Sequence, residues 1–255
     1  MSIDVNVTDG VARVTLNRPD RLNAIDPASE AELDRIWAGI DGNPDIRCVV
    51  LTGTGRAFCA GADMKSKGPD GEDYLVATGR HGFGGIAMGD RLSIPMIARV
   101  NGFALGGGFE MVLGCDLVVA VESATFGLPE PRVGRLPVDG RVTLPRRLPR
   151  ALAMGMLLTG RRISAAEALT FGLINQVVPD DTLDDAVDAW VSDILACAPL
   201  SLKAIKRTVI DTAEMTVPEA RNARLPALMA ALGSRDGREG VRAFREKRAP
   251  VWTGS

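Results

Sequence analysis

Two glutamates, Glu110 and Glu130, are the residues of this sequence best suited to moving protons. Glu110 follows three consecutive glycines in the segment Asn101–Phe109, and Glu130 ends the segment Thr125–Glu130. A pair of carboxylates can act as general acid and general base, and glycine-rich turns can expose backbone N–H groups to an oxyanion. Another glycine-rich turn, Arg56–Lys65, follows a predicted strand. These residues together are suited to chemistry beside an activated carbonyl group.

Each glutamate taken alone has a simpler interpretation as a surface residue, Glu110 on a helix and Glu130 in a loop. The surroundings of Glu110 favour burial instead. It lies in the first turn of a predicted helix, between Phe109 and Met111, in an otherwise apolar segment. A buried carboxylate requires a partner or a function. We therefore expect Glu110 to face a site.

The elements that would position these residues alternate between strands and helices. Residues 2–7 and 11–16 alternate in polarity around Asp9-Gly10, which predicts a hairpin. Asp26 is the expected N-cap of a helix that begins at Pro27. Short apolar runs predict three buried strands, at 46–52, 96–100 and 117–121. Strands separated by helical segments favour an α/β core with parallel pairing.

The chain from Ser164 onward is predicted to be mainly helical. Before it, a glycine-rich stretch at 66–89 is predicted to form a long loop that is a candidate functional segment. A capping box begins at Ser164, and the short helix that follows is closed by Gly172. Helical stripes then cover 183–195, 201–213, 218–232 and 236–247, with no clear strand among them. We expect a catalytic core at 1–197 and a helical oligomerisation region at 198–255.

Composition excludes several classes of protein. The 255 residues carry a net charge of −2, which argues against a nucleic-acid-binding protein. No signal peptide and no membrane-spanning run is visible, so we expect a cytoplasmic protein. The four cysteines are scattered in apolar contexts and form no metal or redox motif. Six arginines between Arg141 and Arg162 can face phosphates or form a solvated surface, and the solvated surface is favoured.

Other catalytic motifs fit this sequence poorly. Gly53-Thr54-Gly55 lacks the third glycine of a dinucleotide-binding turn, because Phe58 stands there. His81 is the only histidine, so a Ser-His-Asp hydrolase would have to use it, and we expect a surface residue instead. With one histidine and no cysteine cluster, a zinc site is not expected.

Several segments, in order along almost the whole chain, resemble the crotonase, or enoyl-CoA hydratase/isomerase, family. They are Asn17-Arg18-Pro19 with Asn23-Ala24, Ala57–Asp63, Asn101–Glu110, Cys115-Asp116, Phe126–Glu130 and Leu158–Ala165. The end of the chain, Phe244–Trp252, together with Ser123–Glu130, resembles the carnitinyl-CoA dehydratase branch. The resemblance implies an α/β fold, a crotonase-like spiral core of repeated ββα units with an all-helical C-terminal region that builds homotrimers, often paired into hexamers.

The resemblance also implies a coenzyme A thioester as substrate, with no separate cofactor and no metal. The N–H groups of Ala62 and Gly107 would hold the thioester oxygen, while Glu110 and Glu130 would hold a water over the 2,3 double bond of an enoyl thioester. Residues implied to contact coenzyme A are Arg21, Ala24, Ala60, Asp63 and Lys65. Either charged side chain, Arg21 or Lys65, could equally be solvated.

The turn at Pro137–Arg141 departs from the glycine-rich turn that hydratases of this family carry beside the active site. Two glycine positions hold Val138 and Arg141, and Asp139 adds a third carboxylate. We expect Asp139 to cap the following helix; pointing inward, it would bind a polar acyl chain or alter the proton chemistry.

An enoyl-CoA hydratase is the leading hypothesis. The alternatives are a carnitinyl-CoA-type dehydratase, an enoyl-CoA isomerase and a catalytically silent acyl-CoA-binding protein.

Overall fold

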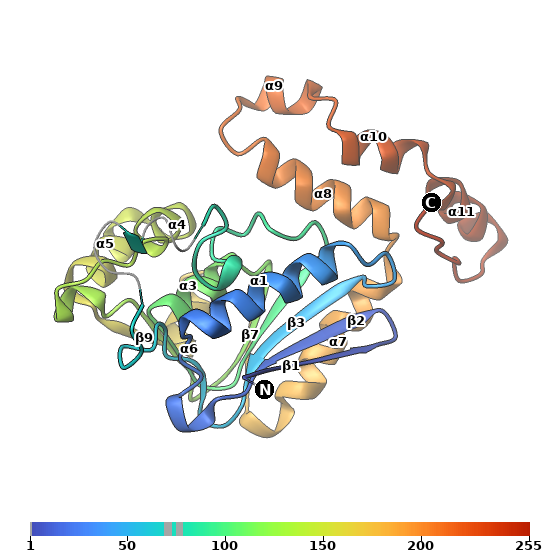
Figure 1. Cartoon of the computed structure of the whole chain (residues 1–255). Coiled ribbons are helices and arrows are strands. Elements are labelled where there is room, and N and C mark those ends of the chain that lie inside the picture. The colour runs from blue at the N-terminus through green and yellow to red at the C-terminus, as the bar shows by residue number, and fades with distance from the viewer. Residues whose placement is uncertain (1, 69–72, 75–78) are drawn as a thin grey trace.

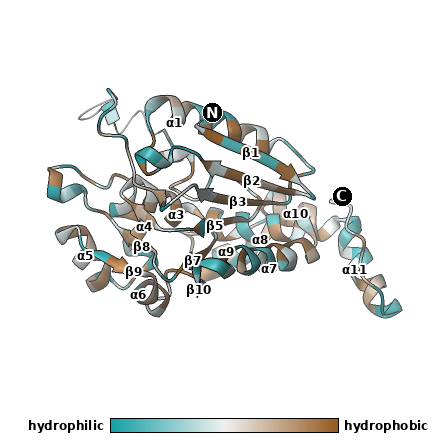
Figure 2. Cartoon of the chain, turned by 90° about the horizontal axis from the view of Figure 1, so that it is seen from below, coloured by the Kyte–Doolittle hydropathy of each residue, from teal (hydrophilic) through white to brown (hydrophobic). Residues whose placement is uncertain are grey.

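A six-stranded sheet forms the base of the molecule. The structure is a computed structural model that describes residues 2–68, 73–74 and 79–255. The strands lie in the order β1-β2-β3-β5-β7-β10 (Figures 1 and 2). Their bounds are β1 Ile3–Thr8, β2 Val11–Leu16, β3 Cys48–Gly53, β5 Met96–Val100, β7 Leu117–Val121 and β10 Gln176–Val178. The predicted hairpin is confirmed as β1 and β2, and the remaining neighbours pair in parallel, as expected.

A second sheet, absent from the sequence prediction, carries the segments that hold the glutamates. Its order is β4-β6-β8-β9, with β4 at Ala57–Cys59, β6 at Phe103–Leu105, β8 at Thr125–Gly127 and β9 at Arg162–Ser164. β4, β6 and β8 pair in parallel, and β9 is antiparallel to β8. Strands of three residues are too short for an alternating pattern to be visible in sequence. β10, which the sequence analysis also missed, is equally short.

Helices cover the sheets and connect them. Their bounds are α1 Pro27–Asp41, α3 Gly107–Gly114, α4 Gly140–Arg147, α5 Arg150–Thr159, α6 Ala165–Thr170 and α7 Leu183–Ala196. Asp26 caps α1 as predicted, since its side chain accepts a hydrogen bond from the Ser29 N–H. The capping box of α6 is also confirmed. Figure 2 shows the apolar strands at the centre of the molecule, with α1 on one side of the large sheet and α7 on the other.

The C-terminal helices extend away from the core (Figure 1). They are α8 Pro199–Asp211, α9 Val217–Asn222, α10 Pro226–Gly233 and α11 Arg235–Glu246. The single helix predicted at 218–232 is therefore wrong, because Ala223 and Leu225 take extended backbone angles just before Pro226. A proline disfavours the helical conformation of the residue before it. No helix in the described ranges is long and apolar enough to cross a membrane.

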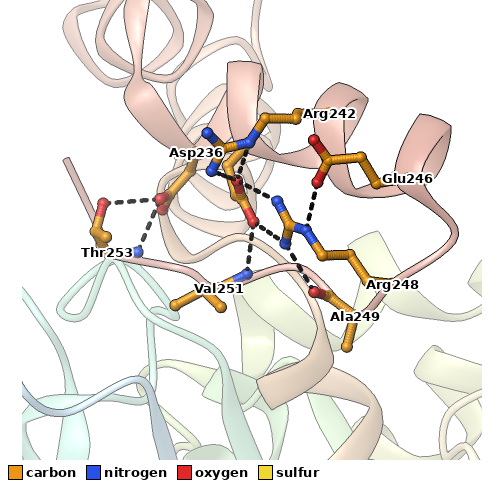
Figure 3. A network of polar contacts seen from close by, with 8 residues as sticks. Asp236, Arg242, Glu246, Arg248, Ala249, Val251 and Thr253 are labelled. Atoms are coloured by element: carbon orange, nitrogen blue, oxygen red, sulfur yellow. Dashed lines mark hydrogen bonds and ion pairs between the residues drawn. The ribbon is translucent and has the colours of Figure 1, made fainter.

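The chain end is fixed on α11 by a polar network (Figure 3). Glu239 accepts hydrogen bonds from Arg248 and Arg242 and from the Val251 N–H. Asp236, which is 1% exposed, accepts hydrogen bonds from the Thr253 and Gly254 N–H groups. The two acidic residues therefore hold the last residues against the helix that precedes them.

Two expectations about single residues need correction. Cys48, Cys59 and Cys115 are buried, but Cys197 is exposed because it follows the end of α7. His81 is not a free surface residue, since its Nδ1 lies 2.7 Å from Asp90 Oδ1 and its side chain is 16% exposed. The predicted loop at 66–89 falls partly outside the described residues.

Candidate active site

Three segments that contain glycine, an acidic residue or both follow the strands of the small sheet at the same edge. Ala60–Ala62 follow β4, Gly106–Glu110 follow β6 and Leu128–Glu130 follow β8. The ends of these strands lie side by side, with Cys59 opposite Ala104 and Leu105 opposite Gly127. The carboxyl ends of parallel strands are the usual place for a ligand site in an α/β fold. The small sheet thus brings together residues that are far apart in the sequence.

Two backbone N–H groups at this edge have no acceptor among the described residues. No described residue accepts a hydrogen bond from the N–H of Ala62 or of Gly107. The two turns lie close together, because a Cβ on Gly61 would come within 3.1 Å of the Gly107 nitrogen. Gly107 is the first residue of α3, so the helix dipole favours negative charge beside it. This pair of donors is suited to an oxyanion.

Glu110 lies in the first turn of α3, and it is 2% exposed, as its apolar neighbours predicted. Its Oε1 accepts hydrogen bonds from the N–H groups of Asp139, at 3.0 Å, and Gly140, at 2.7 Å. Burial raises the pKa of Glu110 to about 8, aided by the charges of Asp139 and Glu130 and opposed by the two N–H donors. A carboxyl group with such a pKa can exchange a proton near neutral pH.

Glu130 begins the short 3₁₀ helix Glu130–Val133, which follows β8. Its Oε2 is buried and has no hydrogen-bond partner among the described residues. Its Oε1 lies beside the turn of the small sheet, since a Cβ on Gly106 would come within 2.8 Å of that oxygen. Burial raises the pKa of the Glu130 carboxyl above its ordinary value. Perturbed carboxyl groups of this kind cluster at functional sites.

A cavity of about 670 Å³ connects the two N–H groups with the two glutamates. Its lining includes Ala62, Gly107, Glu110 and Glu130, together with the apolar residues Met64, Val133, Leu136 and Val138. A second cavity of about 750 Å³ shares Ala62, Met64, Tyr74 and Arg135 with it. The smaller cavity therefore combines an apolar wall with proton-transfer groups. The described residues contain no cluster of histidine, cysteine and acidic side chains that could hold a metal ion.

The expectation that Asp139 caps α4 is wrong. Asp139 occupies the N-cap position, but its side chain makes no capping hydrogen bond. Its Oδ2 instead accepts a hydrogen bond of 2.7 Å from the Phe83 N–H, and the residue is 6% exposed. Burial raises its pKa, while the Phe83 N–H and the charge of Arg141 act in the opposite direction. The side chain points inward, but it faces the Phe83 N–H and lines neither cavity.

The residues expected to contact coenzyme A lie on two sides of the Ala62 turn. Ala60 lines the smaller cavity and Asp63 the larger one. Ala24 is buried, while Arg21 and Lys65 are exposed and line neither cavity. Lys67, which the sequence analysis did not select, lines the larger one.

Arg18 is a further residue of the site. It belongs to the Asn17-Arg18-Pro19 motif, but the sequence analysis assigned it no role. Its guanidinium donates to the Ala24 carbonyl at 2.6 Å and to Asp63 Oδ2 at 3.0 Å. Asp63 also receives the Lys65 N–H. Arg18 therefore fixes the turn that presents Ala62. Within the basic cluster, Arg147 is exposed, and its guanidinium also donates to the Cys115 carbonyl at 3.1 Å.

Comparison with known proteins places the whole chain in one family. The model of the enoyl-CoA hydratase/isomerase family matches residues 6–255. The chain is 40% identical over 257 residues to the (E)-benzylidenesuccinyl-CoA hydratase of Thauera aromatica, with 100% of each chain covered. It is 38% identical over 259 residues to the carnitinyl-CoA dehydratase of Escherichia coli strain K12, covering 99% of this chain and 98% of that one.

Comparison with solved structures leads to the same family. The enoyl-CoA hydratase of Bacillus anthracis matches with a TM-score of 0.93 and 34% identity, covering 100% of both chains. The enoyl-CoA hydratase of Mycobacterium tuberculosis matches with a TM-score of 0.90 and 34% identity, covering 100% of this chain and 99% of that one. These matches confirm the expected crotonase-type α/β fold with its helical C-terminal region. The chain belongs to the enoyl-CoA hydratase/isomerase, or crotonase, family of acyl-CoA enzymes.

Proposed function

We propose that this chain is an enoyl-CoA hydratase that adds water reversibly to the 2,3 double bond of a 2-enoyl-CoA thioester. The observation that carries the proposal is the arrangement of one cavity. The buried Glu110 and the half-buried Glu130 line it together with Ala62 and Gly107, whose N–H groups have no acceptor in the described part of the chain. A hydration needs both components, because it moves two protons and builds up negative charge on the thioester oxygen.

The reaction divides between these groups as follows. The N–H groups of Ala62 and Gly107 hold the thioester oxygen and stabilise the enolate that forms when water attacks C3. One carboxylate takes a proton from the attacking water, and the other carboxyl group delivers a proton to C2. Because the two groups interact, their pKa values belong to the pair. Removal of a single oxyanion donor typically costs about 10²–10³ in rate.

The coenzyme A moiety is proposed to leave the cavity past the Ala62 turn. Ala60, Asp63 and the backbone near Ala24 border this path, with Lys67 on the wall of the larger cavity. Arg21 and Lys65 line neither cavity. Because both are exposed, they stay candidates for contacts with the phosphate groups of coenzyme A outside the cavities. The chain is proposed to act as a homotrimer or a pair of trimers.

A dehydratase of the carnitinyl-CoA type is the second candidate. It would use the same groups in the opposite direction, and one observation favours a polar acyl chain. Besides the glutamate pair, the carboxyl group of Glu30 lies on the wall of the larger cavity, where it can face a polar acyl group. An isomerase needs only one well-placed carboxylate, and a silent binder needs none, so the retained pair argues against both.

Hydration of crotonyl-CoA by the purified protein tests the proposal. We expect loss of the conjugated enoyl absorbance and a product heavier by one water. Glu110→Gln and Glu130→Gln should each lower kcat by about 10²–10⁴, because each removes a proton-transfer group at nearly constant size. The exposed Glu122→Gln serves as the matched control and should keep wild-type activity. Turnover that survives both active-site changes would reject the two-glutamate mechanism, whereas a shifted alkene as product would indicate the isomerase.

A further inference from the structure

Asp139 connects one glutamate of the pair to a distant loop. Its backbone N–H and that of Gly140, at the start of α4, both donate to Glu110 Oε1. Its side chain receives the Phe83 N–H at 2.7 Å. The main chain of this residue thus holds Glu110, while its carboxylate holds residues 82–85. Both contacts are buried.

The loop at 82–85 borders the proposed oxyanion site. The ring of Phe83 covers Gly107 so closely that a Cβ on Gly107 would lie 2.5 Å from the ring carbons. From the other side, α1 holds the same loop, since Glu30 accepts the Gly84 N–H at 2.8 Å and Trp37 donates to the Gly84 carbonyl at 2.7 Å. Displacement of Phe83 would therefore disturb the Gly107 turn.

The backbone around the Asp139 carboxylate is built to receive it. Gly82 has a φ of +72°, and a Cβ there would come within 2.6 Å of Asp139 Oδ2. An ordinary capping aspartate would accept hydrogen bonds from the N–H groups of its own helix. Asp139 makes none of these contacts. Because a buried carboxylate is costly, its retention here calls for another role.

We infer that Asp139 is a positioning residue of the reaction proposed above, which holds Glu110 through its backbone N–H and the Phe83 loop against Gly107 through its carboxylate. The expected effect on turnover rests on the proposed function, whereas the effect of Asp139 on Glu110 and on the Phe83 loop does not. Loss of the carboxylate releases the Phe83 N–H and loosens the start of α4, and both effects reach the reacting groups.

The charge of Asp139 adds a second, separable effect. It raises the pKa of Glu110, together with burial and with the charge of Glu130. It acts in the same way on Glu30, whose pKa burial raises to about 7. The charges of all four carboxyl groups act together to raise the pKa of Tyr74, and the charge of Arg141 acts to lower the pKa of Asp139. Removal of the Asp139 charge must therefore lower the pKa of Glu110. The limb of the pH–rate profile that Glu110 controls then moves to lower pH.

Two substitutions separate position from charge. Asp139→Asn keeps an oxygen acceptor for the Phe83 N–H and removes the charge, while Asp139→Ala removes both. Over about pH 6 to 9, we expect Asp139→Asn to retain kcat within about tenfold and to move the Glu110 limb down by roughly half to one unit. Asp139→Ala should lose a further tenfold or more in kcat, with little change in KM. The control is Asp236→Asn, a buried aspartate that also accepts backbone N–H groups but lies on α11.

A pH titration followed by NMR provides a readout that does not need turnover. It measures the titration midpoint of the ¹³C-labelled Glu110 carboxyl group, whose signal is identified by its absence in Glu110→Gln. A lower midpoint in Asp139→Asn, together with the loss of kcat in Asp139→Ala, supports the inference. An unchanged midpoint, wild-type kcat in Asp139→Ala, or the same losses in Asp236→Asn would overturn it. If the wild type hydrates no enoyl-CoA but the midpoint still moves, the proposed function fails while the effect of Asp139 on Glu110 stands.

Discussion

The two glutamates differ in what contacts each carboxyl group, and this difference suggests which carbon each one serves. Glu110 is held by the N–H groups at the start of α4, whereas one oxygen of Glu130 lies against the Gly106 turn, next to the proposed oxyanion donor. The C2 atom of a bound thioester is bonded to the carbon whose oxygen the donors hold. Glu130 is therefore the nearer candidate for the proton at C2, and Glu110 for the water at C3. Different surroundings commonly divide acid and base roles in this way.

Exchange of the C2 protons of butyryl-CoA in D₂O tests this division. A saturated thioester cannot be hydrated, so exchange requires only the oxyanion donors and the group that serves C2. We expect Glu130→Gln to slow exchange by about 10²–10⁴ and Glu110→Gln to leave it within about tenfold of the wild type. Proton NMR of the thioester follows both. The opposite ranking of the two variants would reverse the assignment.

At the residue scale, sequence predicted well what depends on near neighbours. The burial of Glu110 follows from Phe109 and Met111 beside it, and the cap of α1 from the Asp26-Pro27 pair. Asp139 was misjudged because its partner, Phe83, lies far away in the sequence. Nothing within a few residues of Asp139 indicates that contact. The one available signal was the third carboxylate in a turn that departs from the glycine-rich pattern of the family.

At the scale of elements, the small sheet brings the site together. Each of its parallel strands β4, β6 and β8 is followed by one segment of the site. The hairpin, the capping box and the longer buried strands were predictable because local patterns encode them. The short strands were not, since their pairing depends on contacts between segments distant in sequence. Their turns still appeared as motifs, so the site residues could be selected before the sheet that positions them was known.

Close packing of α3 against the Phe83 loop predicts the effect of a single methyl group. In Gly107→Ala the new Cβ would meet the Phe83 ring at 2.5 Å, so either the ring or the turn must move. We expect kcat for crotonyl-CoA hydration to fall by about 10²–10³, because an oxyanion donor leaves its position.

The matched control for this change is Gly155→Ala in α5, where a Cβ would meet nothing within 4 Å. It should leave kcat unchanged and raise the free energy of unfolding by about 0.5–1 kcal/mol, because alanine favours a helix interior over glycine. Denaturant unfolding and steady-state kinetics measure both variants. Equal activity in Gly107→Ala and the wild type would argue against the N–H of Gly107 as a donor.

At the scale of the whole molecule, the C-terminal helices present apolar side chains that the core does not cover. Phe244 on α11 is 86% exposed, Leu232 on α10 is 73% exposed, and Val209 on α8 is 68% exposed. Large apolar side chains gathered on helices that extend from the core are typical of an interface between subunits. The arrangement in Figure 1 therefore fits the proposed assembly, in which these helices pack on another copy of the chain.

Charges placed on this surface should break the assembly without touching the proposed active site. Light scattering coupled to size-exclusion chromatography should give the wild type a mass of three or six times the 27.0 kDa chain. Leu232→Asp combined with Phe244→Asp should shift it to a single chain, because a buried unpaired carboxylate at an interface is costly. Val7→Asp, at a half-exposed valine on β1, is the control and should keep the wild-type mass. An unchanged mass in the double variant would place the interface elsewhere, and a wild type that elutes as one chain would reject the proposed trimer.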